Sequence, residues 1–544
     1  MIKINETLEI KFPLKLKPRD QQIEGFNFLR NSINNGKKYC LLNLPTGSGK
    51  SYLALMFINW YLNYINENAK FDILTNSKIL QNQYITEYPF IKNYVGRSNY
   101  YCDPYDTDCS KGHEVCKLQG PQCKMDYPYE RAKKEWQESV IGMTNFHLFN
   151  IIALYVRTIL DERDSNVLII DESHDFESVF CDFISTALSA KALKNYGFDL
   201  KEIEDYDFQI RKINTISKYI GFVKNQFIGD LRNKIEWLEE AIKRANPKMR
   251  QEYSKYKAHC DGQLFKFSYL VKEFEKKPDN WILELTKTTT DKMYSGILLE
   301  AKPVWGNDYI KELIFDKYDH VIFMSGSILD KDMFSYINGL ESDLSTYFEV
   351  PSTFAENRRP IFYLKVGKMT WTQKKETFKI QLKYIDKILK KNKDKKGIIH
   401  SGSYEFTKWL QEEYMNSRLI FHTPENRDEM LQKHLNADYP SVIVSPSMMS
   451  GIDLKDDFSR FQIILKIPFP FLGSEKIKMR QKTNKDWYNW KTVVDFIQMY
   501  GRSNRSHDDW AETFVLDSSL SDMLKYNSKL IPRWVTDAIK ILKV

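Results

Sequence analysis

The sequence has 544 residues, too many for one hydrophobic core, so two or more domains are expected. Lys and Arg outnumber Asp and Glu by 80 to 72, and the formal net charge of +8 suits a polyanionic partner without requiring one. We find no apolar run of the roughly 18 residues that a membrane span needs, and the first residues lack the apolar core of a signal peptide. A membrane protein is therefore not expected, and the predicted location is cytoplasmic or nucleoid-associated.

A polar helix start is the first feature along the chain. Arg19 and Gln22 precede the apolar residues Ile23, Phe26 and Leu29, which recur at helical spacing. An Arg and a Gln that approach a nucleotide-binding loop can hold an adenine ring. The alternative is an ordinary solvated helix start, and these residues alone do not decide between the two.

A strand, a turn and a helix are predicted next, over residues 41–57. An apolar run is followed by Gly47 and Gly49, and then by Lys50 and Ser51. The glycines let backbone N–H groups converge on an anion, while the lysine binds the outer phosphates and the serine hydroxyl binds Mg²⁺. We interpret the stretch as the phosphate loop of an ATP site rather than a Gly/Ser turn beside a lysine. Its predicted nucleotide contacts are Pro45, Thr46, Gly47, Ser48, Gly49, Lys50 and Ser51.

Four cysteines recur with six residues between neighbours, in a segment with little apolar core of its own. The chain has seven cysteines, an odd number, and no export signal, so a disulfide framework is not expected. A bound metal that orders the loop is favoured over four free thiols, and zinc and an iron–sulfur cluster both accept four thiolates. The spacing leaves that choice open, and His113 can replace one thiolate. The predicted ligands are Cys102, Cys109, Cys116 and Cys123.

An apolar strand at 166–170 delivers the sequence Asp-Glu-Ser-His. Paired acids at the tip of a buried strand suit Mg²⁺-dependent phosphate chemistry, in which Asp171 holds the ion through water and Glu172 orients or deprotonates the attacking water. The alternative is an acidic helix cap. The phosphate loop upstream favours the first interpretation. Two further strands that end in polar turns are predicted at 71–77 and 140–147.

Between about 185 and 300 apolar residues recur every three or four positions, as they do at 227–242 and 264–274. This pattern predicts a helical insertion. Its many Lys and Arg side chains can contact a nucleic-acid backbone, although a solvated face is the commoner role for such residues.

A second α/β unit is predicted to start near residue 350, where strand and helix patterns alternate again. It has no phosphate loop of its own, but Arg502 and Arg505 lie three apart on one helix face. Two arginines so placed can reach a γ-phosphate across a domain cleft and stabilise developing charge, and a surface pair is the alternative. The lysine-rich run at 390–396 is interpreted as an exposed helix end. Strands of this unit are predicted at 397–400, 441–444, 461–465 and 513–516, and another strand, at 320–324, precedes it.

Taken together, these segments resemble the XPD/DinG family of superfamily 2 helicases, in that family's motif order and over nearly the whole chain. Arg19 and Gln22 resemble the Q-type motif, and residues 171–174 read as a DEAH box. The other matches are 44–51 to motif I, 74–83 to motif Ia, 324–329 to motif III, 401–404 to motif IV, 450–454 to motif V, 498–505 to motif VI, and the more particular stretches 96–102, 144–147, 351–358 and 467–470.

The resemblance implies an α/β fold with two RecA-like P-loop NTPase motor domains, an inserted [4Fe-4S] domain and a helical arch domain. It also favours a [4Fe-4S] cluster over zinc. Two positions depart from the family pattern: Cys123 does not directly precede the Pro-Tyr pair at 128–129, and Ser450 stands where an acid is common in motif V. The implied boundaries are helicase domain 1 at 1–96, 136–180 and 301–345, the iron–sulfur cluster domain at 97–135, the arch at 181–300, and helicase domain 2 at 346–544.

The function that the resemblance implies is an ATP-dependent 5′–3′ DNA helicase that acts as a monomer on single-stranded and forked DNA in replication, repair or recombination. Two alternatives stay open: a translocase or remodeller that does not separate strands, and a damage-binding scaffold with a silent motor. ATP and Mg²⁺ are the implied cofactors beside the cluster, with Ser51 and Asp171 as Mg²⁺ ligands. The implied catalytic residues are Lys50, Asp171, Glu172, His174, Gln498, Arg502 and Arg505, and Arg19, Gln22, Gly451 and Asp453 complete the nucleotide site.

Overall fold

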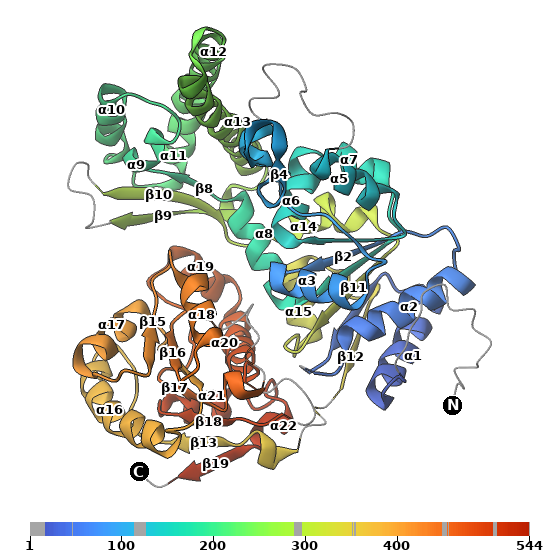
Figure 1. Cartoon of the computed structure of the whole chain (residues 1–544), viewed down its shortest axis with the longest axis vertical. Coiled ribbons are helices and arrows are strands. Elements are labelled where there is room, and N and C mark those ends of the chain that lie inside the picture. Colours follow the sequence, from blue (N-terminus) through green and yellow to red (C-terminus); the bar gives the residue numbers. More distant parts are fainter. Residues whose placement is uncertain are drawn as a thin grey trace.

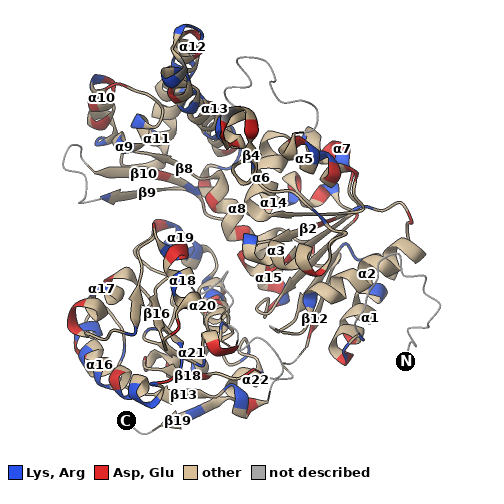
Figure 2. Ribbon diagram, in the orientation of Figure 1, with Lys and Arg blue, Asp and Glu red and all other residues tan. Residues whose placement is uncertain are grey.

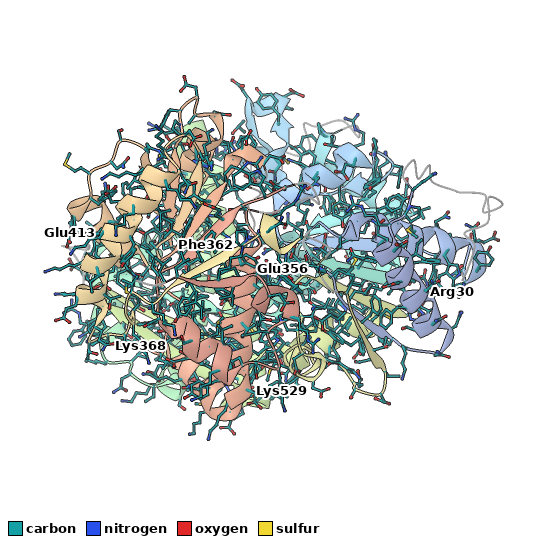
Figure 3. The ribbon with its side chains drawn as sticks, turned by 90° about the horizontal axis from the view of Figure 1, so that it is seen from below. Arg30, Glu356, Phe362, Lys368, Glu413 and Lys529 are labelled. Carbon is teal, nitrogen blue, oxygen red and sulfur yellow. The ribbon has the colours of Figure 1, made fainter. Side chains whose placement is uncertain are left out.

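The computed structural model describes residues 17–45, 47–113, 127–287, 296–350, 352, 355–448, 454, 456–503 and 509–542. Two seven-stranded sheets, each with parallel neighbours throughout, form two α/β domains, and a smaller body of helices and strands rises from the first of them (Figure 1). Seen from below, Arg30 of the first domain and Glu413 of the second lie at opposite ends of the molecule, with Glu356 between the domains (Figure 3). No helix in these ranges is long and apolar enough to cross a membrane.

The first sheet has the strand order β12-β1-β11-β7-β2-β6-β3. Asn43 pairs with Ser325, and Met324 pairs with Asp171, so the carboxyl ends of three adjacent strands meet at one edge of the sheet. That edge therefore collects the side chains and loops that follow these strands. The strands are β1 (Tyr39–Asn43), β2 (Phe71–Thr75), β3 (Lys92–Asn93), β6 (Ile141–Asn145), β7 (Val167–Asp171), β11 (His320–Ser325) and β12 (Ser345–Glu349).

Helices cover both faces of the first sheet, as burial of a parallel sheet requires. Alternate residues of β7 face opposite sides: Ile169 packs in the cluster that includes Phe57, and Ile170 packs in the cluster that includes Phe149. The helices are α1 (Asp20–Asn34), α2 (Lys50–Tyr64), α3 (Lys78–Glu87), α5 (Pro128–Glu138), α6 (Phe146–Tyr155), α7 (Thr158–Arg163), α8 (Phe176–Ile184), α14 (Asn307–Leu313) and α15 (Lys331–Asn338).

The segment predicted as a helical insertion contains the expected helices and also a sheet. The long helices α12 (Ile228–Arg244) and α13 (Pro247–Lys276) pack against each other, and the side chain of Asn246 caps the second. The sheet was not predicted, because β8 is short and many residues of β9 and β10 are only partly buried, so these strands lack a continuous apolar run. The remaining elements are α9 (Ala190–Lys194), α10 (Leu200–Ile210), α11 (Ile216–Phe222), and the antiparallel strands β8 (Thr186–Leu188), β10 (Ile297–Pro303) and β9 (Trp281–Lys287).

The second sheet has the strand order β15-β16-β14-β17-β18-β13-β19. Its strands at 397–400, 441–444, 461–465 and 513–516 confirm the predictions, whereas three others were missed. The strands are β13 (Ile361–Leu364), β14 (Gly397–His400), β15 (Leu419–Phe421), β16 (Val442–Ser445), β17 (Phe461–Ile464), β18 (Glu512–Val515) and β19 (Ile539–Leu542).

Two helices pack on one face of the second sheet and the remaining larger helices on the other. Phe378 and Phe406 share a cluster with Ile463, whereas Phe496 and Met523 share one with Ile464. The first pair is α16 (Lys374–Lys391) and α17 (Tyr404–Glu413), and the others are α18 (Arg427–Asn436), α20 (Lys485–Tyr500) and α21 (Ser519–Tyr526), with α19 (Glu475–Thr483) and α22 (Arg533–Thr536) at the edges.

The boundary between the two domains lies a few residues beyond the predicted one. β12 was not recognised as a strand, and it pairs with β1 in the first sheet from Tyr39↔Ser345 to Asn43↔Glu349. Residues 346–349 therefore belong to the first sheet rather than to helicase domain 2. The error arose because β12 lies at the sheet edge with half-exposed residues, so its sequence lacks the continuous apolar run of a central strand.

Candidate active site

The loop between β1 and α2 has the backbone of a phosphate cradle. Gly47 and Gly49 adopt φ values of 79° and 78°, in the left-handed region that favours glycine. A Cβ on Gly49 would lie 2.2 Å from Nε2 of Gln22, so a larger residue cannot fit without displacing that side chain. Lys50 and Ser51 begin α2, as the sequence predicts, and Thr46 lies outside the described residues.

Arg19 and Gln22 hold this loop by its carbonyl groups. The Nη1 of Arg19 donates a hydrogen bond to the carbonyl of Gly47 at 2.8 Å, and the Nε2 of Gln22 donates one to the carbonyl of Gly49 at 3.0 Å. The backbone N–H of Arg19 donates to Oε1 of Gln22 at 2.8 Å, which fixes that amide. The two residues therefore set the shape of the cradle. Contact with an adenine ring stays a prediction.

The two acids lie where β7 ends, opposite Lys50. Asp171 is buried, and burial raises its pKa to about 6, although Lys50 opposes that rise. The Nζ of Lys50 lies 3.8 Å from Oε1 of Glu172, whose φ of 53° is unusual for a residue with a side chain. Strain of this kind is found at functional sites. The structure thus brings Lys50 and both acids together, as predicted.

Two tyrosines of the α3 region support the acid and the cradle, and the sequence analysis missed both. The hydroxyl of Tyr84 donates to Oδ2 of Asp171 at 2.9 Å, and Tyr88, four residues later, forms a hydrogen bond with Ser51. Burial and the nearby Asp171 carboxylate raise the pKa of Tyr84 well above its usual value, so it remains a donor. Tyr84 lies on α3, whereas Tyr88 follows its last residue, so the spacing of four between them gave no reliable signal in the sequence.

A chain of hydrogen bonds runs from the DEAH segment into the second domain. Nδ1 of His174 lies 2.9 Å from Oγ of Ser325, and the N–H of Ser327 donates to that Oγ at 3.2 Å. The Nε2 of Gln498, from α20, donates to Oγ of Ser327 at 2.7 Å and lies 3.5 Å from Nδ1 of His174. These residues come from three predicted motifs, and all four side chains are buried.

Arg502 lies at the end of the same chain. Its Nε donates to the backbone carbonyl of Gln498 at 2.8 Å, and its Nη2 donates to the Gln498 side-chain oxygen at 2.5 Å. The amide of Gln498 is thereby engaged at both ends, by Ser327 and by Arg502. Three other predicted site residues, Arg505, Gly451 and Asp453, lie outside the described residues.

A second contact between the domains lies farther from the nucleotide loop, and no sequence pattern indicated it. The Nη2 of Arg480, from α19, lies 2.5 Å from Oε1 of Glu177 on α8, and both side chains are almost fully buried. The Arg480 guanidinium also lies over the rings of Trp305 and Trp487, at 4.6 and 5.0 Å from their centres. Although burial disfavours a charged Glu177, the adjacent Arg480 holds its pKa below the usual value.

Two of the four clustered cysteines are described, and both are buried. Cys102 ends β4 (Tyr101–Cys102) and Cys109 follows β5 (Thr107–Asp108), its N–H bonded to the carbonyl of Tyr100 at 2.8 Å. Burial raises the pKa of Cys109, and Arg97 opposes the rise. Two buried thiols on one hairpin beside an arginine fit the donor chemistry of a thiolate-bound metal. Within the described ranges no three metal-binding side chains converge, and Cys116 and Cys123 lie outside those ranges.

Comparisons with known proteins agree with this architecture. The family model described as a helicase C-terminal domain matches residues 385–538, and the one described as a type III restriction enzyme res subunit matches residues 15–200. No curated protein matches the chain. Three solved structures are similar to the chain: "XPD_APO" at 14% identity and a TM-score of 0.63, "XPD_Helicase" at 15% identity and a TM-score of 0.62, and "Structure of S. tokodaii Xpd4" at 14% identity and a TM-score of 0.57. The three matches cover 97%, 97% and 96% of this chain, respectively, and 100% of each of the other chains.

The fold and the site define the class. The first α/β domain carries the phosphate loop and the DEAH segment, and the second matches the helicase C-terminal domain model, so the chain has the two-domain arrangement of a helicase. Within that class the fold is of the XPD type, because these neighbours align with the chain along nearly its whole length.

Proposed function

We propose that this chain is an ATP-dependent 5′–3′ DNA helicase that translocates on single-stranded DNA and unwinds duplexes. The observation that carries the proposal is the buried path from His174 through Ser325 and Ser327 to Gln498, because it links the acid-bearing loop to the second domain. A silent scaffold has no need for such a path. A change at the nucleotide can travel along it and alter how the domains meet.

The residues of the first domain divide the work of ATP hydrolysis. Lys50 binds the outer phosphates, and its present partner Glu172 becomes free to orient the attacking water once phosphate takes the lysine. Ser51 and Asp171 would hold Mg²⁺, which neutralises phosphate charge when bound. Tyr84 keeps the Asp171 carboxylate turned into the site.

The second domain contributes the arginines. Arg502 is held by Gln498, and Arg505 follows on the same predicted helix end. When the domains close on ATP, these side chains stabilise the charge that develops on the transferred phosphoryl group. Release of phosphate then relaxes the closed arrangement, and alternating closure advances the strand.

The four cysteines are proposed to hold a [4Fe-4S] cluster that orders the segment around 97–135, which has few apolar residues of its own. The buried pair Cys102 and Cys109 supports this assignment. Anaerobically purified protein is expected to be brown and to contain about four iron atoms, as a four-cysteine cluster requires. Colourless protein that contains zinc would contradict the cluster.

The test of the proposed function has two stages. ATPase activity is measured with and without single-stranded DNA, and strong stimulation is expected. Partial duplexes with either a 5′ or a 3′ single-stranded tail are then offered with ATP, and only the 5′-tailed substrate should separate. Stimulated hydrolysis without strand separation would favour the translocase or remodeller, and no hydrolysis at all would favour the scaffold.

A further inference from the structure

Helix α16 carries a row of lysines along its solvent-facing side. Lys375, Lys379, Lys383 and Lys387 recur every fourth residue, and all four are exposed. At the rise of an α-helix, successive members stand about 6 Å apart along the axis. We call these four residues the α16 lysine row.

The lysines of the row do not form the ion pairs that other helical lysines of this chain form, although Glu376 and Asp386 lie on the same helix; Asp386 is paired with Lys390 instead. Lys257 and Lys408 each lie within 3.6 Å of an acid four residues later on their own helix. No member of the α16 row makes an ion pair within the part of the chain that the structure describes. Four charges so close together repel one another, so their arrangement favours an anionic partner.

An aromatic ring extends the row at its beginning. Trp371 lies four residues before Lys375, and it is 82% exposed, an unusual state for so large a ring. Its position is not random: Nζ of Lys374 lies 4.0 Å from the ring centre and is itself held by Glu405 at 2.7 Å. The ring is therefore anchored on one side while most of its surface meets solvent.

The row lies away from the nucleotide site. The buried side of α16 packs through Phe378 and Ile385 on one face of the second sheet, whereas α20, which carries Gln498, packs on the opposite face. α16 accordingly lies at the outer edge of the second domain (Figure 2). Its charges cannot serve ATP, so their role needs a separate explanation.

We propose that the α16 lysine row and Trp371 form a second binding surface for single-stranded nucleic acid. The lysines contact successive phosphates, and Trp371 stacks on a base, as aromatic rings do in proteins that bind single strands. A duplex is a poorer partner because its base faces are already stacked. The choice of nucleic acid rests on the proposed function, but the surface binds without ATP.

The test compares two variants with the same change in net charge. In one, the four lysines of the row become glutamine; in the other, the matched control, Lys433, Lys525, Lys529 and Lys540 become glutamine. The control lysines are also exposed in the second domain but lie on other elements. Affinity for a long and a short oligothymidylate is measured without ATP over a range of salt concentrations.

The row variant is expected to bind the long strand more weakly and with a flatter salt dependence. Each lost phosphate contact removes about 0.7 from the slope of log affinity against log salt, so four contacts remove about 3. The short strand, which the motor domains alone can hold, should be bound as by the wild type. Trp371→Ala should weaken long-strand binding about tenfold, and Trp371→Phe should restore most of it.

Equal slopes for the row variant and the control variant would overturn the proposal. So would a row variant that keeps its oligonucleotide affinity but loses binding to vesicles of anionic lipid, since a membrane would then be the partner. ATP hydrolysis at saturating short strand should be unchanged in both variants. If the wild type shows no DNA-stimulated hydrolysis, the helicase proposal fails, while the salt slopes still decide the fate of this surface.

Discussion

The two contacts between the domains differ in chemistry. The path through Ser325, Ser327 and Gln498 consists of neutral hydrogen bonds beside the nucleotide loop, whereas Arg480 and Glu177 form a buried ion pair enclosed by tryptophans. Neutral hydrogen bonds exchange partners at little cost, but separating a buried ion pair is expensive. The first contact is therefore suited to change during the ATP cycle, and we call it the exchangeable contact. The second is suited to remain in place as a fixed point about which the domains turn, and we call it the fixed contact.

The largest expected effect comes from a change in the nucleotide loop, beside which the exchangeable contact lies. Lys50→Ala should reduce DNA-stimulated ATPase activity to background, because the outer phosphates lose their lysine and Glu172 loses its present partner. Binding to single-stranded DNA should persist, since it needs no hydrolysis. Steady-state ATPase assays and DNA titrations measure the two properties. A Lys50→Ala protein that hydrolyses ATP normally would refute the assignment of the site.

Arg480→Met should have the largest effect on stability. The substitution keeps the length of the side chain but leaves Glu177 buried without its partner, which costs about 3 to 5 kcal/mol. Urea unfolding measures the loss, and Lys478→Met, an exposed position on the same helix, is the control. The double variant with Glu177→Gln should regain much of the stability. If Arg480→Met unfolds like the wild type, this contact is not a fixed point.

The sequence predicted the exchangeable contact far better than the fixed one. Lys50, Glu172, His174 and Gln498 lie in motifs whose residue types are dictated by phosphate chemistry, so their meeting could be inferred without coordinates. Arg480 looked like one more charged residue on a polar helix. Its burial depends on Trp305 and Trp487, which reach it only after the two domains have folded and docked.

The fold shows the same division. Central strands such as β7 were predicted because burial on both faces makes them continuously apolar. The edge strand β12 and the sheet of the inserted segment were missed, since their half-exposed residues are not distinguishable from loops. Tyr84 was missed for a different reason: its role is set by the carboxylate that it meets, and nothing in its own segment reveals that partner.

Gln498→Ala sharpens the comparison, because it removes the exchangeable contact without touching the phosphate loop. Ser327 and Arg502 would each lose a buried partner, at about 1 to 3 kcal/mol. We expect the stimulation of ATPase activity by single-stranded DNA to fall about 10- to 100-fold, with basal hydrolysis changed less. Rates with and without DNA give the ratio. Gln432→Ala, at an exposed position on α18, serves as the control and should leave the ratio unchanged.

Tyr84→Phe is expected to give the smallest effect. It tests how the carboxylate of Asp171, near the exchangeable contact, is held in place. The variant keeps the buried ring and loses only the hydroxyl that donates to Asp171. Groups that orient a metal-binding carboxylate affect metal affinity by about tenfold, so the Mg²⁺ concentration for half-maximal activity should rise by up to that factor. Maximal activity at high Mg²⁺ should approach that of the wild type, because the carboxylate itself remains. Tyr61→Phe removes a hydroxyl from another buried tyrosine, on α2, and should leave the Mg²⁺ dependence unchanged. A Tyr84→Phe variant with normal Mg²⁺ dependence but lower stability would assign Tyr84 to packing alone, and Asp171 would then be positioned by β7 and the N–H of Glu172.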